Sequence, residues 1–326
     1  MLKLLIYRFF YTLQKSYDNI DKLLPLLTNK EILKELFLQN EYKMKIRKAL
    51  NYTINGEKYK VENIHIKKEG SIARANISLI HSFNYNTNGN ALTSSERLYF
   101  ILILKKFKIS WRIVDICNRD LFPITYERLK KKSLFSNIST PIDMQNRITF
   151  LEEQLSSLNS FIINFKGITS SPQLPMQIRA KLYDKEAAVQ YAQRYALNYN
   201  TKYKNFNDNG GDCTNYVSQC INAGGIPTSN SWKPYSNSWL RVNELYYYLT
   251  RRGIGIDITS KNLYKEGCII QFYANIKGYF SHSGVITKVL PNGEYLYCCH
   301  SYDKLNFPLS EIFPFMYDKI RVIQLL

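Results

Sequence analysis

The sequence predicts an α+β protein of two domains joined by a helical connector. A length of 326 residues exceeds that of one typical domain. Residues 1 to about 50 have helical periodicity and are followed by strand patterns, and a second run of helices followed by strands fills the C-terminal part. We therefore expect an N-terminal α+β domain over residues 1–122, a connector over 123–180 and a C-terminal domain over 181–326.

The N-terminal domain is predicted to place helices before an antiparallel meander. A second helix is expected from near Asn29, and residues 73–79 alternate apolar and polar side chains as a half-buried strand does. Residues 98–104 form a continuous apolar run, and a strand over 111–116 follows a lysine-rich turn. This order resembles the cystatin-like, nuclear-transport-factor-like α+β cone, a module that more often binds, dimerises or positions a partner domain than catalyses.

The connector is punctuated by prolines and serine-rich stretches. Within it, apolar residues recur at alternating spacings of four and three, which is a heptad seam. Its members are Met144, Ile148, Leu151, Leu155, Leu158, Ile162 and Phe165. A helix over 144–165 is therefore expected, and it either packs along one of the two domains or forms a homodimer.

The C-terminal domain is predicted to place its helices before its sheet. Asp184 opens one helix, and another is expected around residues 242–249. Strand patterns follow over 268–272, 283–289, 295–300 and 320–323, with a hairpin turn at 291–293.

The stretch 209–220 joins a glycine turn to the start of an amphipathic helix, and a cysteine stands at the junction. Asp212 is a favourable N-cap residue and Gly224-Gly225 is a stop signal, so the spacing predicts a helix with Cys213 in its first turn. A thiol there experiences the positive end of the helix dipole, which favours the nucleophilic thiolate. Cys213 is therefore a candidate nucleophile, with a buried structural thiol as the alternative.

Gly210 and Gly211 precede this helix. Glycines let the backbone approach a substrate closely, so that neighbouring N–H groups can serve as an oxyanion hole.

Two histidines lie at strand ends that a hairpin would bring together. A cysteine amidase needs an imidazole within reach of the thiolate and a third polar group that holds the imidazole's tautomer. His282 opens the strand 283–289 and His300 closes the next one. Across a turn at Asn292-Gly293 the two ends are neighbours, with a small offset that a bulge would absorb.

From about Tyr183 to Asp303 the sequence resembles the putative amidase domain family of Gram-positive bacteria, which is related in fold to the NlpC-type and CHAP-type cell-wall peptidases. The resemblance rests on blocks that occur in order: residues 183–188, 191–196, 212–220 and 223–225, Ser238-Trp239 with Val242-Asn243, Ile270-Gln271, His282-Ser283 with 285–287, and 300–303. It implies a papain-like fold with an antiparallel sheet, with Cys213 as nucleophile, His282 as base and His300 as third member. Asp303 and Asn215 are alternatives for the third position.

The sequence departs from the family in two respects. Gly267 is followed by Cys268 where family members usually carry an aspartate, which puts any role of that carboxylate in doubt. The first 180 residues lie outside the resemblance.

The charge favours polyanionic surroundings. Lysine and arginine number 44 against 26 acidic residues, a net charge of +18, which suits nucleic acid, an anionic cell wall or an acidic membrane face. No zinc finger, RNA-recognition signature or long basic arm is present, so sequence-specific nucleic-acid binding is not expected.

The six cysteines predict reduced thiols. Positions 117, 213, 220, 268, 298 and 299 form no regular disulfide framework. Cys268, Cys298, Cys299 and His300 lack the usual zinc-ligand spacing, so we expect neither a metal nor another cofactor.

The amino terminus is apolar but is interrupted by charge, and no small-residue cleavage site follows. We therefore expect neither a signal peptide nor a membrane span. A cytoplasmic location is the default expectation, and export by a non-standard route or a missing export signal is the alternative.

These observations predict a cysteine-dependent amidohydrolase acting on a peptide or amide substrate, with cell-wall peptide favoured by the resemblance. The alternative is a catalytically silent binding or scaffold protein that assembles through its N-terminal domain and connector helix. A third possibility is an acyl transferase that passes the acyl group to an amine.

Overall fold

The computed structural model confirms the α+β class. It describes residues 1–15, 19–87, 90–131, 141–169, 183–259 and 264–326. The chain forms two compact units, of which the first comprises Met1–Ala49, Thr53–Asn84 and Arg97–Asn159 and the second Leu50–Tyr52, Tyr85–Glu96 and Ser160–Leu326. The predicted domain limits at residues 122 and 180 differ from this division, and they stay predictions.

The first unit begins with helices, as expected. They are α1 (Leu2–Gln14), the 3-10 helix η1 (Ile20–Leu26) and α2 (Lys30–Ala49). Asn29 starts α2 by accepting a hydrogen bond from the Ile32 N–H through its side-chain oxygen. The buried side of α1 contributes Ile6, Phe9 and Phe10 to the core of this unit.

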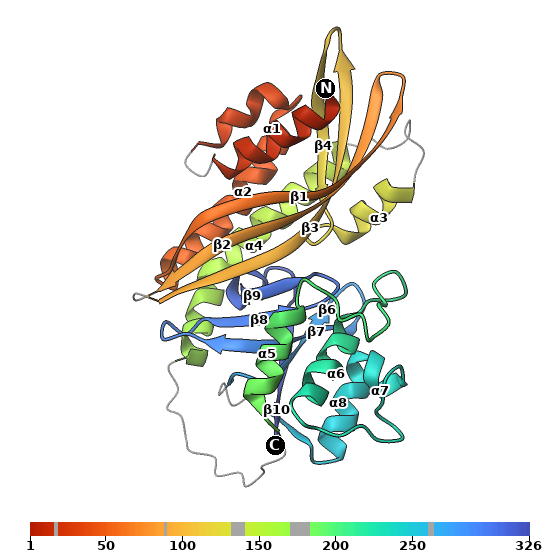
Figure 1. Cartoon of the computed structure of the whole chain (residues 1–326). Helices are drawn as coiled ribbons and strands as arrows, with labels where there is room; N and C mark the ends of the chain where they lie inside the picture. Colours follow the sequence, from red (N-terminus) through yellow and green to blue (C-terminus); the bar gives the residue numbers. More distant parts are fainter. Residues whose placement is uncertain (16–18, 88–89, 132–140, 170–182, 260–263) are drawn as a thin grey trace. The chain divides into compact units, whose positions relative to one another are not determined.

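Four strands follow in the order β1, β2, β3, β4, and α3 (Pro123–Lys131) comes after them. The strands are β1 (Thr53–Glu69), β2 (Ile72–Thr87), β3 (Asn90–Phe107) and β4 (Ser110–Asn118). The alternation predicted over 73–79 is present in β2, where Ala73, Ala75, Ile77 and Leu79 are all buried. Figure 1 shows α1 and α2 beside this sheet.

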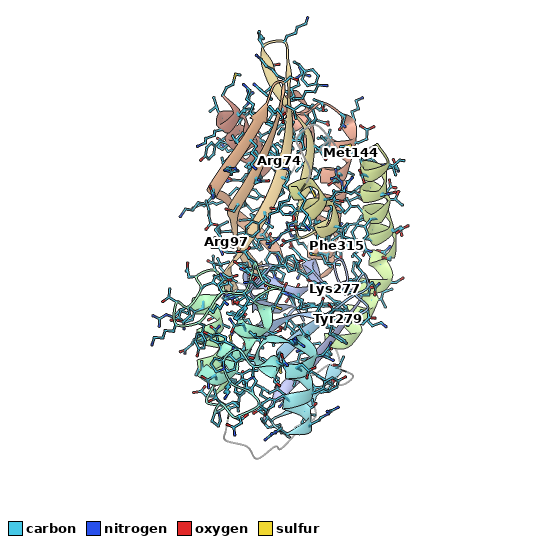
Figure 2. All side chains as sticks on the ribbon, turned by 90° about the vertical axis from the view of Figure 1, so that its right-hand side faces the viewer. Arg74, Arg97, Met144, Lys277, Tyr279 and Phe315 are labelled. Atoms are coloured by element: carbon cyan, nitrogen blue, oxygen red, sulfur yellow. The ribbon has the colours of Figure 1, made fainter. Side chains whose placement is uncertain are left out.

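The predicted heptad helix is α4 (Pro141–Thr169). Met144, labelled in Figure 2, packs into the core of the first unit, and Phe165 contacts Tyr295 within the second. Met144, Ile148, Leu151 and Leu158 are buried within the chain itself. The seam thus already has partners, and a homodimer through 144–165 stays a prediction. Residues 132–140 and 170–182 of the predicted connector lie outside the described residues.

The second unit contains a sheet of antiparallel pairs. Residues of β3 pair with β9, and the order continues β8, β7, β6, β10, β5. The strands are β5 (Gly255–Asp257), β6 (Ile269–Ala274), β7 (Tyr279–Val289), β8 (Tyr295–Cys299), β9 (Lys304–Pro308) and β10 (Lys319–Leu325). The sequence patterns predicted four of these strands and missed β5 and β9.

Helices of the second unit pack against this sheet or against one another (Figure 1). They are α5 (Lys185–Tyr195), α6 (Cys213–Ala223), α7 (Asn237–Leu240) and α8 (Val242–Arg251), and the 3-10 helix η4 (Leu309–Glu311) follows β9. Their shared core includes Trp232 and Trp239 together with Ile269, Val285 and Cys298 of the sheet.

The hairpin of β7 and β8 contains a shift in register, of the kind that the sequence spacing predicts. Val285 pairs with Cys298 and Ile286 with Tyr297, and the register then shifts, so that Lys288 pairs with Leu296. The printed pairing begins at Val285 and Cys298, and His300 directly follows the last residue of β8.

No helix among the described residues is long and apolar enough to cross a membrane.

Candidate functional site

The candidate nucleophile Cys213 is the first residue of α6, as the sequence predicts. The residue is only 7% exposed. Among the described residues, the one hydrogen-bonding contact of its Sγ is with Thr214 Oγ1, at 3.7 Å. The thiol therefore makes no hydrogen bond to either predicted catalytic histidine in this structure.

Asp212 precedes the helix but does not cap it with its side chain. Its φ of −107° and ψ of 0° differ from the extended conformation of most capping residues. Its Oδ1 accepts hydrogen bonds from the Phe206 N–H and from Asn215 Nδ2, both at 2.9 Å. The backbone N–H groups of Cys213, Thr214 and Asn215 have no acceptor in the described part of the chain.

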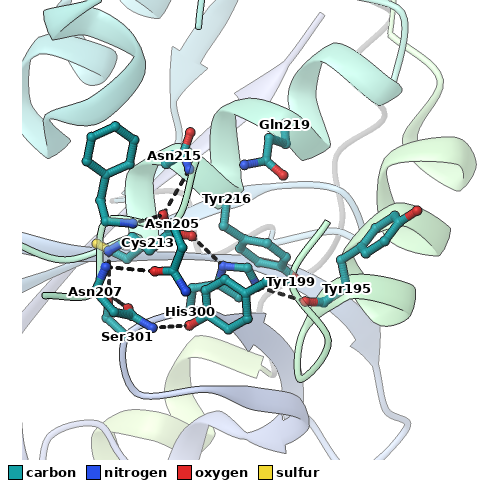
Figure 3. A network of polar contacts seen from close by, with 12 residues as sticks. Tyr195, Tyr199, Asn205, Asn207, Cys213, Asn215, Tyr216, Gln219, His300 and Ser301 are labelled. Carbon is teal, nitrogen blue, oxygen red and sulfur yellow. Dashed lines mark hydrogen bonds and ion pairs between the residues drawn. The ribbon is translucent and has the colours of Figure 1, made fainter. Parts of the chain in front are cut away.

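His300 pairs with the other oxygen of the same carboxylate. Its Nδ1 lies 2.7 Å from Asp212 Oδ2, and its Nε2 lies 2.7 Å from the Tyr195 carbonyl oxygen. The ring is stacked between Tyr199 and Tyr216, with centroid distances of 3.9 and 4.0 Å. His300 is thus buried with both ring nitrogens engaged, and it could orient His282 only by exchanging one of these bonds (Figure 3).

A second group of polar contacts holds the loop before Cys213. The Asp212 N–H donates to Ser301 Oγ at 2.6 Å, and Ser301 Oγ donates to Asn207 Oδ1 at 3.0 Å. Gly211 has a φ of +106°, and a Cβ there would lie 3.2 Å from Ser301 Oγ. The glycine therefore permits the close approach of this loop to the end of β8.

His282 lies in β7, next to the residue that contacts the first turn of α6. Its neighbour Ser283 points toward α6, because Ser283 Oγ lies 3.2 Å from Thr214 Oγ1. The His282 ring is buried and contacts the rings of Phe272, Tyr302 and Tyr317. The residues that follow Cys213 and His282 in the chain therefore touch, although the thiol and the imidazole do not hydrogen-bond.

The two other candidates for the third catalytic residue, Asn215 and Asp303, also make hydrogen bonds to other groups. Asn215 donates from Nδ2 to the Lys204 carbonyl oxygen and to Asp212, and its Oδ1 accepts from Trp239 Nε1 at 2.8 Å. Asp303 Oδ1 accepts from the Tyr199 hydroxyl at 2.7 Å. The four sequence candidates other than His282 thus meet in or around one polar network.

Sequence reasoning missed Asn207, Ser301 and Tyr199 as members of this network. The stretch 198–209 is rich in asparagine, a residue that often hydrogen-bonds to backbone in loops, and this was the available signal. Hydrogen bonds between residues about 100 positions apart cannot be recognised from the local sequence pattern.

The remaining cysteines differ from Cys213 in their surroundings. Burial raises the pKa of Cys268 to about 11 and the pKa of Cys117 and Cys298 to about 12. Burial also raises the pKa of Cys220 and of Cys299 well above the ordinary range. These five thiols stay protonated at neutral pH and are poor nucleophiles.

Comparison with known proteins gives a family match for the C-terminal part. Residues 182–325 match the family described as "Putative amidase domain". Two similar proteins come from Bacillus subtilis (strain 168). "Uncharacterized protein YjcM" is 31% identical over 168 residues, which cover 48% of this chain and 40% of that protein. "Uncharacterized protein YhbB" is 33% identical over 121 residues, which cover 33% and 38%.

The chain spans about two fifths of the length of these curated relatives. No solved structure matches it. The papain-like and cystatin-like resemblances therefore stay predictions.

Proposed function

We propose that the C-terminal unit is a cysteine amidase that hydrolyses an amide bond through an acyl-enzyme, with Cys213 as the nucleophile. The position of the thiol carries the proposal. Cys213 begins α6, where three backbone N–H groups lack an acceptor among the described residues. The helix dipole and these N–H groups favour a thiolate and a developing oxyanion at the same end of the helix. The family match to residues 182–325 indicates an amidase-type function.

The proposed reaction has two steps. The Cys213 thiolate attacks the amide carbonyl carbon, and the Cys213 N–H donates to the resulting oxyanion. The carbon–nitrogen bond then breaks as protonated His282 gives its proton to the leaving amine, which leaves a thioester. Neutral His282 next takes a proton from water, the hydroxide attacks the thioester, and the carboxylic acid and the thiolate are released.

His282 has to approach the thiol for this reaction. Thr214 and Ser283, which follow the two residues in the chain, already contact one another. The β6–β7 register shifts between Phe272 and Tyr273, beside His282, and such irregularities re-aim side chains. Catalytic hydrogen bonds in unliganded enzymes are often long and tighten when substrate binds. We therefore propose that the thiol–imidazole pair forms in the substrate complex.

Cell-wall peptide is the proposed substrate class. The resemblance to cell-wall peptidases favours it, and a net charge of +18 suits an anionic wall.

The test is hydrolysis of muropeptides and of simple peptide amides by the whole chain. Cys213→Ala should abolish product, and His282→Gln should lower the rate by roughly a hundredfold or more, the scale of general acid–base catalysis. Cys220→Ala on the same helix is the matched control and should retain activity. A thioester adduct should be detectable by mass in the wild type and absent from Cys213→Ala.

A catalytically silent binding protein is the second candidate, because the thiol lacks a hydrogen bond to either histidine. Saturable muropeptide binding without hydrolysis, unchanged by Cys213→Ala, would support this candidate and contradict the amidase.

A further inference from the structure

We propose that His300 acts as a positioning residue that holds the Asp212 carboxylate away from the N-terminus of α6, and so keeps the first-turn N–H groups available. The inference rests on the proposed role of Cys213 as nucleophile. It assigns His300 a task different from that of orienting His282.

The two partners of the His300 ring determine where its hydrogens lie. Its Nε2 faces a backbone carbonyl oxygen, which only accepts, so Nε2 carries a hydrogen. Its Nδ1 faces a carboxylate oxygen of Asp212. The other oxygen of that carboxylate already accepts two hydrogen bonds, from the Phe206 N–H and Asn215 Nδ2, which favours the ionised carboxylate. Nδ1 is therefore the donor in the 2.7 Å contact that holds Oδ2 in place.

Aromatic rings fix the position of the imidazole. The electron-rich faces of Tyr199 and Tyr216 cover both sides of His300. The Tyr199 hydroxyl donates to Asp303, which brings a second carboxylate close behind the first tyrosine. Two carboxylates, Asp212 and Asp303, and two tyrosines, Tyr199 and Tyr216, thus surround the ring.

Without His300, the Asp212 carboxylate would have other donors within reach. An aspartate immediately before a helix ordinarily turns its oxygen to the N–H groups of the first turn. Here Asp212 does not do so, because its oxygens are held by His300, Phe206 and Asn215. Without His300, Oδ2 loses its donor, and the N–H groups of the first turn of α6 are the free donors next to it in the chain.

Such a turn of Asp212 would affect Cys213 in two ways. A carboxylate over the helix N-terminus would occupy the N–H groups proposed to bind the oxyanion. Its negative charge next to Cys213 would also disfavour the thiolate. His300 would therefore be needed for thiol reactivity without touching the reacting atoms.

A double-mutant cycle on thiol alkylation tests this proposal. His300→Phe keeps an aromatic ring between the two tyrosines and removes both donors, and Asp212→Ala removes the carboxylate. The rate of Cys213 alkylation by iodoacetamide at pH 7 is measured in the wild type, both single variants and the double variant, with Cys213→Ala as the blank. Thermal unfolding establishes that each variant is folded.

We expect His300→Phe to slow alkylation roughly tenfold when Asp212 is present, because a charge at a helix end changes the free energy of the thiolate by about that much. When Asp212→Ala has removed the carboxylate, the same substitution should slow alkylation by less than about twofold. Equal slowing in both backgrounds would overturn the proposal and would mean that His300 acts on the thiol directly. Alkylation requires no amide hydrolysis, so this result is independent of whether the proposed substrate is cleaved.

A second measurement keeps the proposal testable if His300→Phe does not fold. Nitrogen-15 NMR of the wild-type imidazoles at pH 7.5 should show one ring with hydrogen on both nitrogens, coupled to a carboxylate. His300→Gln or selective labelling identifies that signal. If every histidine ring has one bare nitrogen, the ion pair is absent and the proposal fails.

Discussion

At the scale of single residues, Cys213 differs from the other five cysteines in position and in surroundings. It alone begins a helix, whereas burial raises the pKa of each of the other five thiols well above its ordinary value. Iodoacetamide at neutral pH should therefore modify Cys213 first. Peptide mapping by mass spectrometry after brief treatment checks this expectation, and modification of Cys268 or Cys298 at a similar rate would contradict it.

Asn215 illustrates how a single side chain secures the start of α6. Its Oδ1 is the acceptor for the indole N–H of the fully buried Trp239, and its amide nitrogen supports Asp212 and Lys204. Asn215→Ala should lower the free energy of unfolding by roughly 2–3 kcal/mol, because buried donors and acceptors lose their partners.

The matched control for this prediction is Asn222→Ala, later on the same helix. Asn222 donates a single hydrogen bond, to the Ile226 carbonyl oxygen, and is half-buried. Its replacement should cost about 1 kcal/mol or less. Chemical denaturation of both variants gives the comparison, and equal losses would show that the Trp239 contact contributes little.

At the scale of elements, a buried carboxyl group links the β7–β8 turn to η4. Glu294 accepts hydrogen bonds from the Tyr295 N–H at 2.9 Å and the Ser310 N–H at 3.2 Å, and it also contacts the Ser310 hydroxyl. Burial raises its pKa from 4.5 to about 7. The folded protein thus holds this proton more tightly than the unfolded chain, so Glu294 stabilises the fold most at low pH.

This linkage predicts that the contribution of Glu294 is lost as pH rises from about 5 to 8. The difference in pKa corresponds to roughly 3 kcal/mol. Glu294→Gln cannot ionise, so the stability of this variant relative to the wild type should increase over that interval. Urea denaturation at pH 5, 6.5 and 8 measures the change, and a constant difference between the two proteins would refute the assignment.

The elements also show how far the sequence determines the prediction. Long periodic segments such as α4 and the start of α6 were predictable, because their side-chain spacing reports one buried face. The three-residue β5 and the mixed pattern of β9 offered no such period. Local pattern also placed Asp212 before α6 but predicted capping, whereas a partner 88 residues away, His300, takes its carboxylate.

The same limit applies to the histidine pair. Counting from the turn brought His282 and His300 to neighbouring strand ends, but it did not settle the register to a single residue. The irregularity near Thr287 decides which residues face each other, and a shift of one position moves a side chain to the other face. Sequence spacing alone cannot determine such an irregularity, so the relation of the two rings required the structure.

At the scale of the whole molecule, the net charge of +18 bears on substrate encounter rather than on chemistry. A basic protein associates with polyanions through long-range attraction, which salt screens over a distance of about 8 Å at physiological ionic strength. Cys213, in contrast, is only 7% exposed and begins α6 directly after a hydrogen-bonded loop. Salt should therefore affect binding to an anionic wall far more than it affects alkylation of Cys213.

Sedimentation with cell-wall sacculi tests this separation. Binding to sacculi that carry their anionic polymers should fall by roughly tenfold or more between about 50 and 300 mM NaCl, because several charges are screened together. Sacculi stripped of those polymers should bind more weakly, and the alkylation rate should change by less than about twofold over the same range. Salt-independent binding of equal strength to both kinds of sacculi would show that contacts other than charge bring this protein to the wall.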